Sequence, residues 1–267
     1  MDIGTILGLL IGVGGILLGN LIEGGKFSQI MQPTAAMIVL GGTIGATMIQ
    51  FPFRTFIRAV KSVRTVFQEP QSRTGAVIEE IVGYATIARK DGILSLEGIV
   101  GKSSDPFLTK ALMMAIDGAD STAMRESLEP AIGQIEEAGE DAAKVFEAAG
   151  GFSPTIGIIG AVLGLIQVMS NLSDIAKVGE GIATAFVATI YGVGFANLIA
   201  LPIGGKLKLR NREAVAAREL MLEGALAIQQ GLNPKLIRER LSSLHAAPEA
   251  PAKPASETAS EQADAVA

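Results

Sequence analysis

The chain has 267 residues, of which 49% are hydrophobic and only 4% aromatic, and its formal net charge is −5. The absence of cysteine excludes disulfides, and a single histidine, His245, cannot build a Cys/His zinc site, so no metal site is expected. The acidic balance, without basic residues interleaved with aromatic ones, argues against nucleic-acid binding. The apolar residues must therefore be concentrated in particular segments.

Four segments lack Asp, Glu, Lys and Arg and are long enough to cross about 30 Å of hydrocarbon as helices. They are residues 3–22, 33–51, 152–170 and 182–203. The first resembles a secretory signal, but no basic stretch precedes it and it is longer than a typical signal core, so we expect it to be retained. The sequence predicts an all-α membrane protein with four transmembrane helices.

Basic residues cluster after the second and the fourth predicted spans. They are Arg54, Arg58, Lys61 and Arg64, and then Lys206, Lys208, Arg210 and Arg212. Because short cytoplasmic loops carry an excess of Lys and Arg, these ends are expected in the cytoplasm. The connections 23–32 and 171–181 are then outside, and both termini are cytoplasmic.

The hydrophilic part of the chain is predicted to be a helical cytoplasmic domain. We expect membrane helices in residues 1–51 and 152–204, a cytoplasmic helical loop in 52–151, a helical segment in 205–245 and a disordered tail in 246–267.

Helix boundaries can be predicted at a few positions in this hydrophilic part. Apolar spacing indicates a helix that begins near Ser121 and is interrupted near Pro130 before the third span. A second helical rod is predicted to break between Gly231 and Pro234.

The third and fourth spans each have one face made of small residues. At about 100° per residue, one stripe contains Pro154, Gly157, Ala161, Gly164 and Val168, and the other contains Thr189, Gly192 and Ala196. Such faces either pack other helices of the same complex or line a polar path. A lone threonine in a span commonly bonds a carbonyl of its own helix, so Thr189 alone does not decide between these functions.

The predicted spans contain no Asp, Glu, His, Lys or Arg. Ion conduction through a membrane normally needs such a group at depth, because a buried carboxylate can bind and release a cation or a proton. If this chain takes part in ion flux, another polypeptide must supply the carboxylate.

Several motifs together resemble a known family. They are FSPTIGIIGAVLGLIQVM, GIATAFVATIYGVGFANLIALPIGGKLKLR, DPFLTKALMMAIDG and ARKDGILSLE. These motifs and the four-span layout resemble the MotA/PomA subunits of the bacterial flagellar stator over about residues 1–240. More distantly, the third and fourth spans are similar to the ExbB/TolQ proton-channel superfamily.

The resemblance implies a motor part in the bacterial inner membrane, without an enzymatic activity or a cofactor. It implies a pentameric, ring-forming homo-oligomer around the single helices of two MotB-type partners, which supply the ion-carrying Asp and bind peptidoglycan. Ion flow would turn the ring, and cytoplasmic charges would push the rotor protein FliG.

The expected ion pathway and partner-facing residues are Pro154, Gly157, Ala161, Gly164, Thr189 and Gly192. Pro154 and Thr189 match family residues by position, whereas the three glycines are included because they share the small-residue faces. Pro154 and Pro202 match two prolines of the family that are associated with conformational change. Each proline removes a backbone donor and can kink its helix, although both can also simply mark helix ends. Sodium-driven relatives carry a threonine in place of Ala161. Because alanine offers no oxygen ligand to Na⁺, the resemblance favours protons.

Arg89, Lys90 and Glu97 match the charges that face the rotor in the family. Sodium-type relatives carry further acids after this glutamate, where Gly98 and Val100 stand here. A surface charge is usually only solvated, so this assignment rests on the resemblance.

Two alternatives stay open. One is an ExbB/TolQ-type energising proton channel, although those relatives typically have three spans and lack the ARKDGILSLE segment. The other is an enzyme or carrier with a pocket between spans. Against it, a lone histidine leaves no Ser/His/Asp set, no P-loop, HExxH or dinucleotide motif occurs, and GVGG at residues 12–15 lies inside a predicted span.

Overall fold

The computed structural model describes residues 2–68 and 74–245, which form two compact units. The first unit contains the described residues of Met1–Arg73 and Thr122–Glu219. The second contains those of Thr74–Ser121 and Leu220–Ala267. Each unit is therefore assembled from two separate stretches of the chain.

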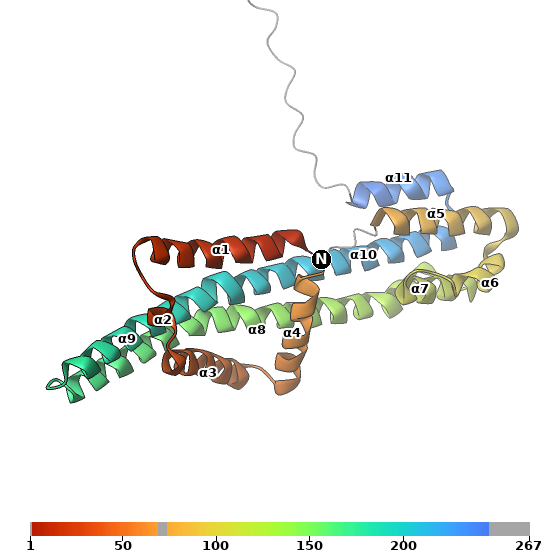
Figure 1. Cartoon of the computed structure of the whole chain (residues 1–267). Coiled ribbons are helices and arrows are strands. Elements are labelled where there is room, and N and C mark those ends of the chain that lie inside the picture. Colours follow the sequence, from red (N-terminus) through yellow and green to blue (C-terminus); the bar gives the residue numbers. More distant parts are fainter. Residues whose placement is uncertain (1, 69–73, 246–267) are drawn as a thin grey trace, which may run out of the picture. The chain divides into compact units, whose positions relative to one another are not determined.

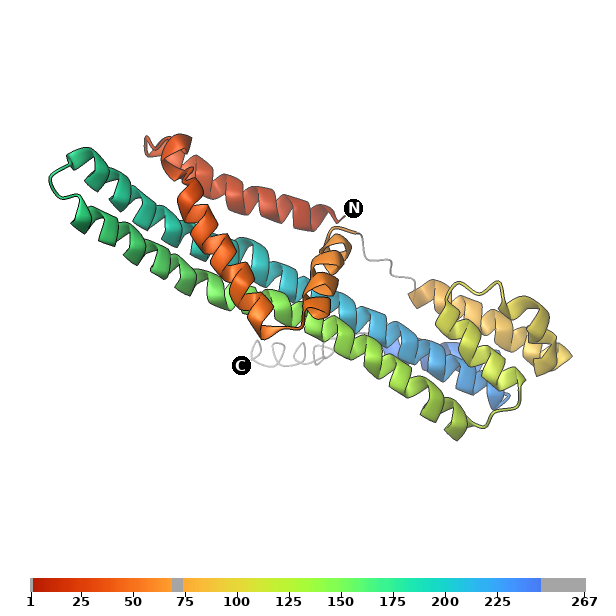
Figure 2. The same ribbon diagram turned by 90° about the horizontal axis from the view of Figure 1, so that it is seen from below.

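The first unit is built from helices, several of them long (Figures 1 and 2). They are α1 (Ile3–Ile22), α2 (Phe27–Ile30), α3 (Pro33–Gln50), α4 (Phe53–Val66), most of α8 (Ser121–Ser170), α9 (Ile175–Phe195), the π-helical turn η2 (Ala196–Ala200) and the start of α10 (Leu201–Gln229). A short turn joins α8 to α9, and the two helices lie side by side in both views, with α3 against α9.

Four helices are long and apolar enough to cross a membrane, as the sequence predicts. The first two match the predicted segments closely, whereas the other two are parts of longer helices, Ser121–Ser170 and Ile175–Gln229. No residue of α1 is buried. Large apolar side chains also line the outside of α8, namely Ile158, Ile159, Val162, Leu163, Leu165 and Ile166. Because exposing this surface to water is unfavourable, lipid or other chains must cover it.

The predicted interruption near Pro130 is wrong, because α8 continues through this residue. Pro130 is exposed, and Met124, Leu128 and Ile132 are buried on either side of it. Their burial outweighs the cost of about 3 kcal/mol of an interior proline. The predicted break after the fourth span is confirmed, since α10 ends at Gln229 and α11 begins at Pro234.

The second unit contains α5 (Thr74–Asp91), the 3-10 turn η1 (Ile93–Leu96), α6 (Glu97–Val100), α7 (Pro106–Ile116), the end of α10 and α11 (Pro234–His245). Its fully buried side chains include Ile81, Leu96, Leu108, Leu112, Ile237 and Leu241. Gly224 of α10 allows a close approach, because a Cβ there would lie 2.7 Å from Cδ1 of Ile81. Arg238 of α11 also pairs with Glu79 of α5 through two hydrogen bonds of 2.5 and 2.7 Å.

The two units do not follow the predicted linear segments. Helix α4 and the first half of α8 fold with the apolar helices, because Ala59 packs against Ala142 and Val145. Val66 likewise packs against Ala143 and Leu207. The predicted tail, 246–267, lies outside the described residues.

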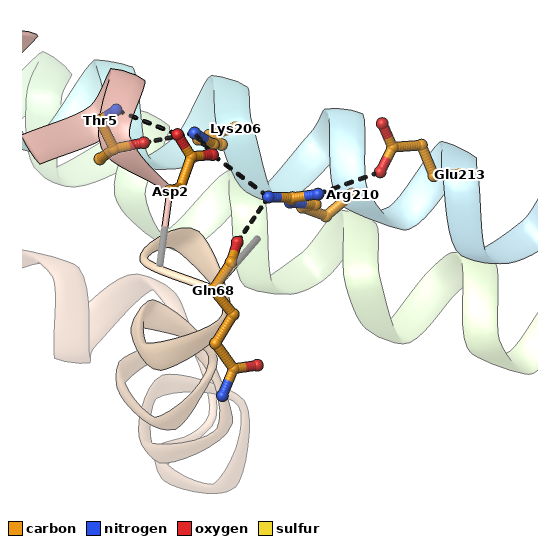
Figure 3. A network of polar contacts seen from close by, with 6 residues as sticks. All are labelled: Asp2, Thr5, Gln68, Lys206, Arg210 and Glu213. Carbon is orange, nitrogen blue, oxygen red and sulfur yellow. Dashed lines mark hydrogen bonds and ion pairs between the residues drawn. The ribbon is translucent and has the colours of Figure 1, made fainter. Parts of the chain in front are cut away.

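A polar network joins the start of α1 to α4 and α10 (Figure 3). One Asp2 carboxylate oxygen accepts from the Thr5 backbone N–H at 3.1 Å, and the other accepts from Lys206 and, at 3.3 Å, from Arg210. Arg210 also donates to the Gln68 carbonyl at 2.7 Å. The hydrogen bond from Lys206, followed by that from the Thr5 backbone, holds the pKa of Asp2 below its usual value.

We expect Asp2→Asn to lower the melting temperature of the purified protein at neutral pH. Asparagine keeps the helix cap but removes the charge that attracts Lys206 and Arg210. Because the pKa of Asp2 is lowered in the folded protein, the stabilisation is complete above the unfolded pKa of about 3.9 and is lost as the pH falls through the folded value. The difference from wild type should therefore persist at pH 5 and shrink below about pH 4.

Asp174→Asn is the matched control, since Asp174 caps α9 and pairs with Lys177 at 3.7 Å, but its side chain is 47% exposed. It should change the melting temperature little, because exposed pairs contribute little. Equal effects of the two variants would contradict the importance of the network.

Candidate functional site

Helices α8 and α9 approach each other through glycines. A Cβ on Gly157 would lie 2.9 Å from the carbonyl oxygen of Ala188, and one on Gly192 would lie 2.6 Å from that of Ser153. Both distances are shorter than a Cβ tolerates, and backbone atoms cannot move aside as a flexible side chain can. The two predicted small-residue faces therefore pack against each other.

Gly157, Gly164 and Gly192 pack against the neighbouring helix of the same chain, and that they also line an ion pathway or face a partner stays a prediction. All three are buried, and the Cβ direction of Gly164 points at the backbone of Gly181 and Ala185. The physical reason is the short turn between α8 and α9, which makes the neighbouring helix of the same chain the nearest surface for each face.

Pro154, Ala161 and Thr189 lie beside this contact and are half-buried. The Thr189 hydroxyl donates to the Ala185 carbonyl at 3.3 Å, the local hydrogen bond that a lone threonine favours. Its oxygen keeps lone pairs that can accept from a protonated carboxyl or bind a cation. Ala161 offers no such oxygen. That these residues face a partner helix stays a prediction.

The two prolines have different surroundings. Pro154 lies well inside α8, whereas Pro202 is the second residue of α10, directly after η2. Because Pro202 has no N–H for the carbonyl of Leu198, the regular helical hydrogen bonding is broken here. The π-helical turn Ala196–Ala200 lies at this break, and such turns are frequent at functional sites.

Three polar groups at the spans were not predicted. The Tyr191 hydroxyl donates to the Ile30 carbonyl at 2.6 Å and accepts from the Gln32 N–H at 3.3 Å, so it ties α9 to the start of α3. The hydroxyls of Thr43 and Ser153 are buried and have no hydrogen-bond partner among the described residues. The sequence signals them only as polar residues within apolar segments.

The predicted rotor-facing charges lie in the second unit around a tight turn. Arg89 and Lys90 are exposed in the last turn of α5, and Glu97 is exposed at the start of α6. Gly92 forms the turn with a φ of 86°, and Leu96 anchors η1 in the core with no exposed surface. The structure therefore places these three charged residues on either side of one short turn, with their side chains exposed to solvent.

Glu80, which the sequence did not indicate, holds the loop after α6. Its carboxylate accepts from the Ser104 N–H at 3.0 Å, from the Ser104 hydroxyl at 2.5 Å and from the Tyr84 hydroxyl at 3.2 Å. Burial by itself raises the pKa of Glu80, but the hydrogen bonds, those of Ser104 first, outweigh it and lower the pKa below its usual value. The loop is thus fixed to α5, the helix that carries Arg89.

Comparison with known proteins shows which family this chain resembles in sequence and fold. The model of the MotA/TolQ/ExbB proton channel family matches residues 100–220, and that of the motility protein A N-terminal region matches residues 6–91. Motility protein A of Helicobacter pylori (strain ATCC 700392 / 26695) is 38% identical over 90% of this chain and 94% of its own length. The chain belongs to the motility protein A family. The resemblance predicted from the sequence motifs is confirmed.

Other relatives of this chain include the chemotaxis protein PomA of Vibrio alginolyticus, 32% identical over 91% of this chain and 95% of its own length. The MotAB structure of C. jejuni aligns with a TM-score of 0.87 and 30% identity, covering 93% of this chain and 98% of that chain. The flagellar MotAB stator complex from Bacillus subtilis aligns with a TM-score of 0.83 and 30% identity over 90% and 95%.

We expect Gly192→Ala to destabilise the protein by about 1–3 kcal/mol, because the new methyl group would press on the α8 backbone. Gly194→Ala, two residues further along α9, is the matched control, since nothing lies within 4 Å of its Cβ position. Alanine also favours a helix over glycine, so the control should be neutral or slightly stabilising. Thermal unfolding of both purified variants measures this, and equal melting temperatures would rule out the close packing.

Proposed function

We propose that the chain is the ring-forming subunit of a flagellar stator that forms an ion channel with a MotB-type partner and converts ion flow into torque on FliG. The observation that carries this proposal is the likeness to two MotAB complexes over at least 90% of the chain. The four spans predicted from the sequence, 3–22, 33–51, 152–170 and 182–203, also contain no Asp, Glu, Lys or Arg. A channel built from this chain therefore needs a partner with a carboxylate.

The proposed assembly is a pentameric ring in the bacterial inner membrane, with the single helices of two partners inside it. The exposed apolar side chains of α8, including Ile158 and Leu165, supply surface that neighbouring copies, partner helices or lipid would cover. The basic residues after α3 and along the start of α10 favour a topology with both termini in the cytoplasm.

Protons are the favoured ion, with Na⁺ as the alternative. A dehydrated Na⁺ needs several oxygen ligands, and Ala161 supplies none. The oxygen of Thr189 is enough to accept one hydrogen bond from a protonated carboxyl of the partner. This supports proton transfer in which the carboxyl binds the ion and the threonine orients it.

The exposed charges Arg89, Lys90 and Glu97 are proposed to contact FliG. Charges of this kind govern orientation and encounter more than affinity, which suits a contact that must form and break at each step. The loop that Glu80 fixes would keep this surface rigid while it pushes.

An ExbB/TolQ-type energising channel is the second candidate, because the family model matched at residues 100–220 describes both groups. The match of residues 6–91 to the motility protein A N-terminal region favours the stator. It includes most of α1, all of α3 and the residues Arg89 and Lys90 proposed to face the rotor.

The function can be tested by motility in a host deleted for its own stator, with this chain expressed together with its single-span partner. We expect swimming in soft agar that continues without sodium and stops with a protonophore. Swimming that requires sodium would keep the stator and overturn the choice of ion. No swimming, despite both chains in the membrane and a FliG from the same source, would contradict the proposal.

We expect Arg89→Glu to reduce motor speed at high load while ion flux through the complex stays near the wild-type level, because the residue lies in the second unit and outside the spans. A reversed charge places like charges at the rotor contact, which is costly. Lys235→Glu, an equal charge change at an exposed site on α11, should leave speed unchanged. Equal speeds of the two variants under load in a bead assay would remove Arg89 from the rotor contact.

A further inference from the structure

Helix α4 carries a strong positive charge that the proposed motor does not use. Its sequence, FRTFIRAVKSVRTV, contains Arg54, Arg58, Lys61 and Arg64 and no acidic residue. All four basic side chains are exposed. At about 100° per residue, Arg54, Arg58 and Lys61 lie on one side of the helix, with Arg64 at its edge.

The other sides of α4 carry no basic residues and are either buried or apolar. Ala59 has no exposed surface and Val66 only 1%, and they pack against α8 and α10. Between this buried side and the basic side, Phe53 is 63% exposed and Val60 is 50% exposed. The helix therefore presents one side to the protein, an apolar edge and a basic face.

The orientation of α4 is fixed at its C-terminal end. The Asp2 N–H donates to the Phe67 carbonyl at 3.0 Å. Arg210 donates to the Gln68 carbonyl at 2.7 Å (Figure 3). With Ala59 and Val66 buried as well, α4 cannot rotate its basic face inward. The exposure of the four charges is thus built into the fold.

The position of α4 places this face at the membrane surface. Helix α3, one of the four apolar spans, ends at Gln50, and only Phe51 and Pro52 separate it from α4. An amphipathic helix at this level presents its apolar edge to acyl chains and its basic residues to headgroups.

We propose that the basic face of α4 binds the phosphate groups of anionic phospholipids. Charge complementarity and the exposed Phe53 beside the charges favour lipid over an acidic protein surface, which would leave this apolar edge without a function. Lipid bound here would hold α4 at the membrane surface. Through the hydrogen bonds of Gln68 and Phe67 it would also restrain the position of α10 and the start of α1.

The test uses the purified full-length chain, co-expressed with its partner, in vesicles that contain spin-labelled phosphatidylglycerol or phosphatidylcholine. We expect a preference for phosphatidylglycerol that falls about fivefold in the double variant Arg58→Gln/Lys61→Gln and weakens in high salt. Lys102→Gln/Lys110→Gln removes the same charge from exposed sites of the second unit and should keep the preference.

An unchanged preference in the α4 variant, or an equal loss in the control, would overturn the proposal. Loss of the preference on adding inorganic phosphate at constant ionic strength would assign the face to free phosphate instead. A smaller oligomer with an unchanged lipid preference would make it a contact with a second copy of the chain. None of these readouts requires motor function, so the proposal can fail independently of the stator function.

Discussion

The close packing of α8 on α9 determines which surfaces of the apolar helices remain available to lipid and to other chains. Gly157 and Gly192 face each other's helix, and a methyl group at either would press on backbone atoms. The two helices therefore behave as one paired element, joined by a short turn. Their outer sides, rich in exposed Ile, Leu and Val, are left for lipid, neighbouring copies or a partner helix.

Within the predicted spans 152–170 and 182–203, this paired element supplies shape and a few hydroxyls but no Asp, Glu, Lys or Arg. Thr189 bonds its own helix and keeps acceptor capacity, and Ala161 adds no ligand. Ion chemistry in such a protein must be divided between polypeptides, with the carboxylate on one and the surrounding surface on the other. The charges that act on a rotor in the proposed function lie in a separate compact unit, where Leu96 and Glu80 fix the turn and the loop beside them.

The sequence predicts the four spans well because each is a long apolar segment without charge, and the break near Gly231 because glycine and proline end helices. It also predicts which small residues share a face. It does not tell which surface meets that face, so the packing of Gly157, Gly164 and Gly192 against the neighbouring helix of their own hairpin is known only from the structure. The continuity through Pro130 depends on packing by Leu128 and Ile132, and the hydrogen bonds of Tyr191 and Glu80 depend on segments distant in the chain. Local patterns carry no signal for any of these.

The central claim, that this chain forms an ion path only with a carboxylate from its partner, is tested most directly by ion flux into vesicles. Three samples are compared: this chain alone, this chain with its single-span partner, and the same complex with the partner's intramembrane Asp replaced by Asn. The account predicts flux only in the second sample. Equal flux from the chain alone, or flux unaffected by the Asn replacement, would contradict it.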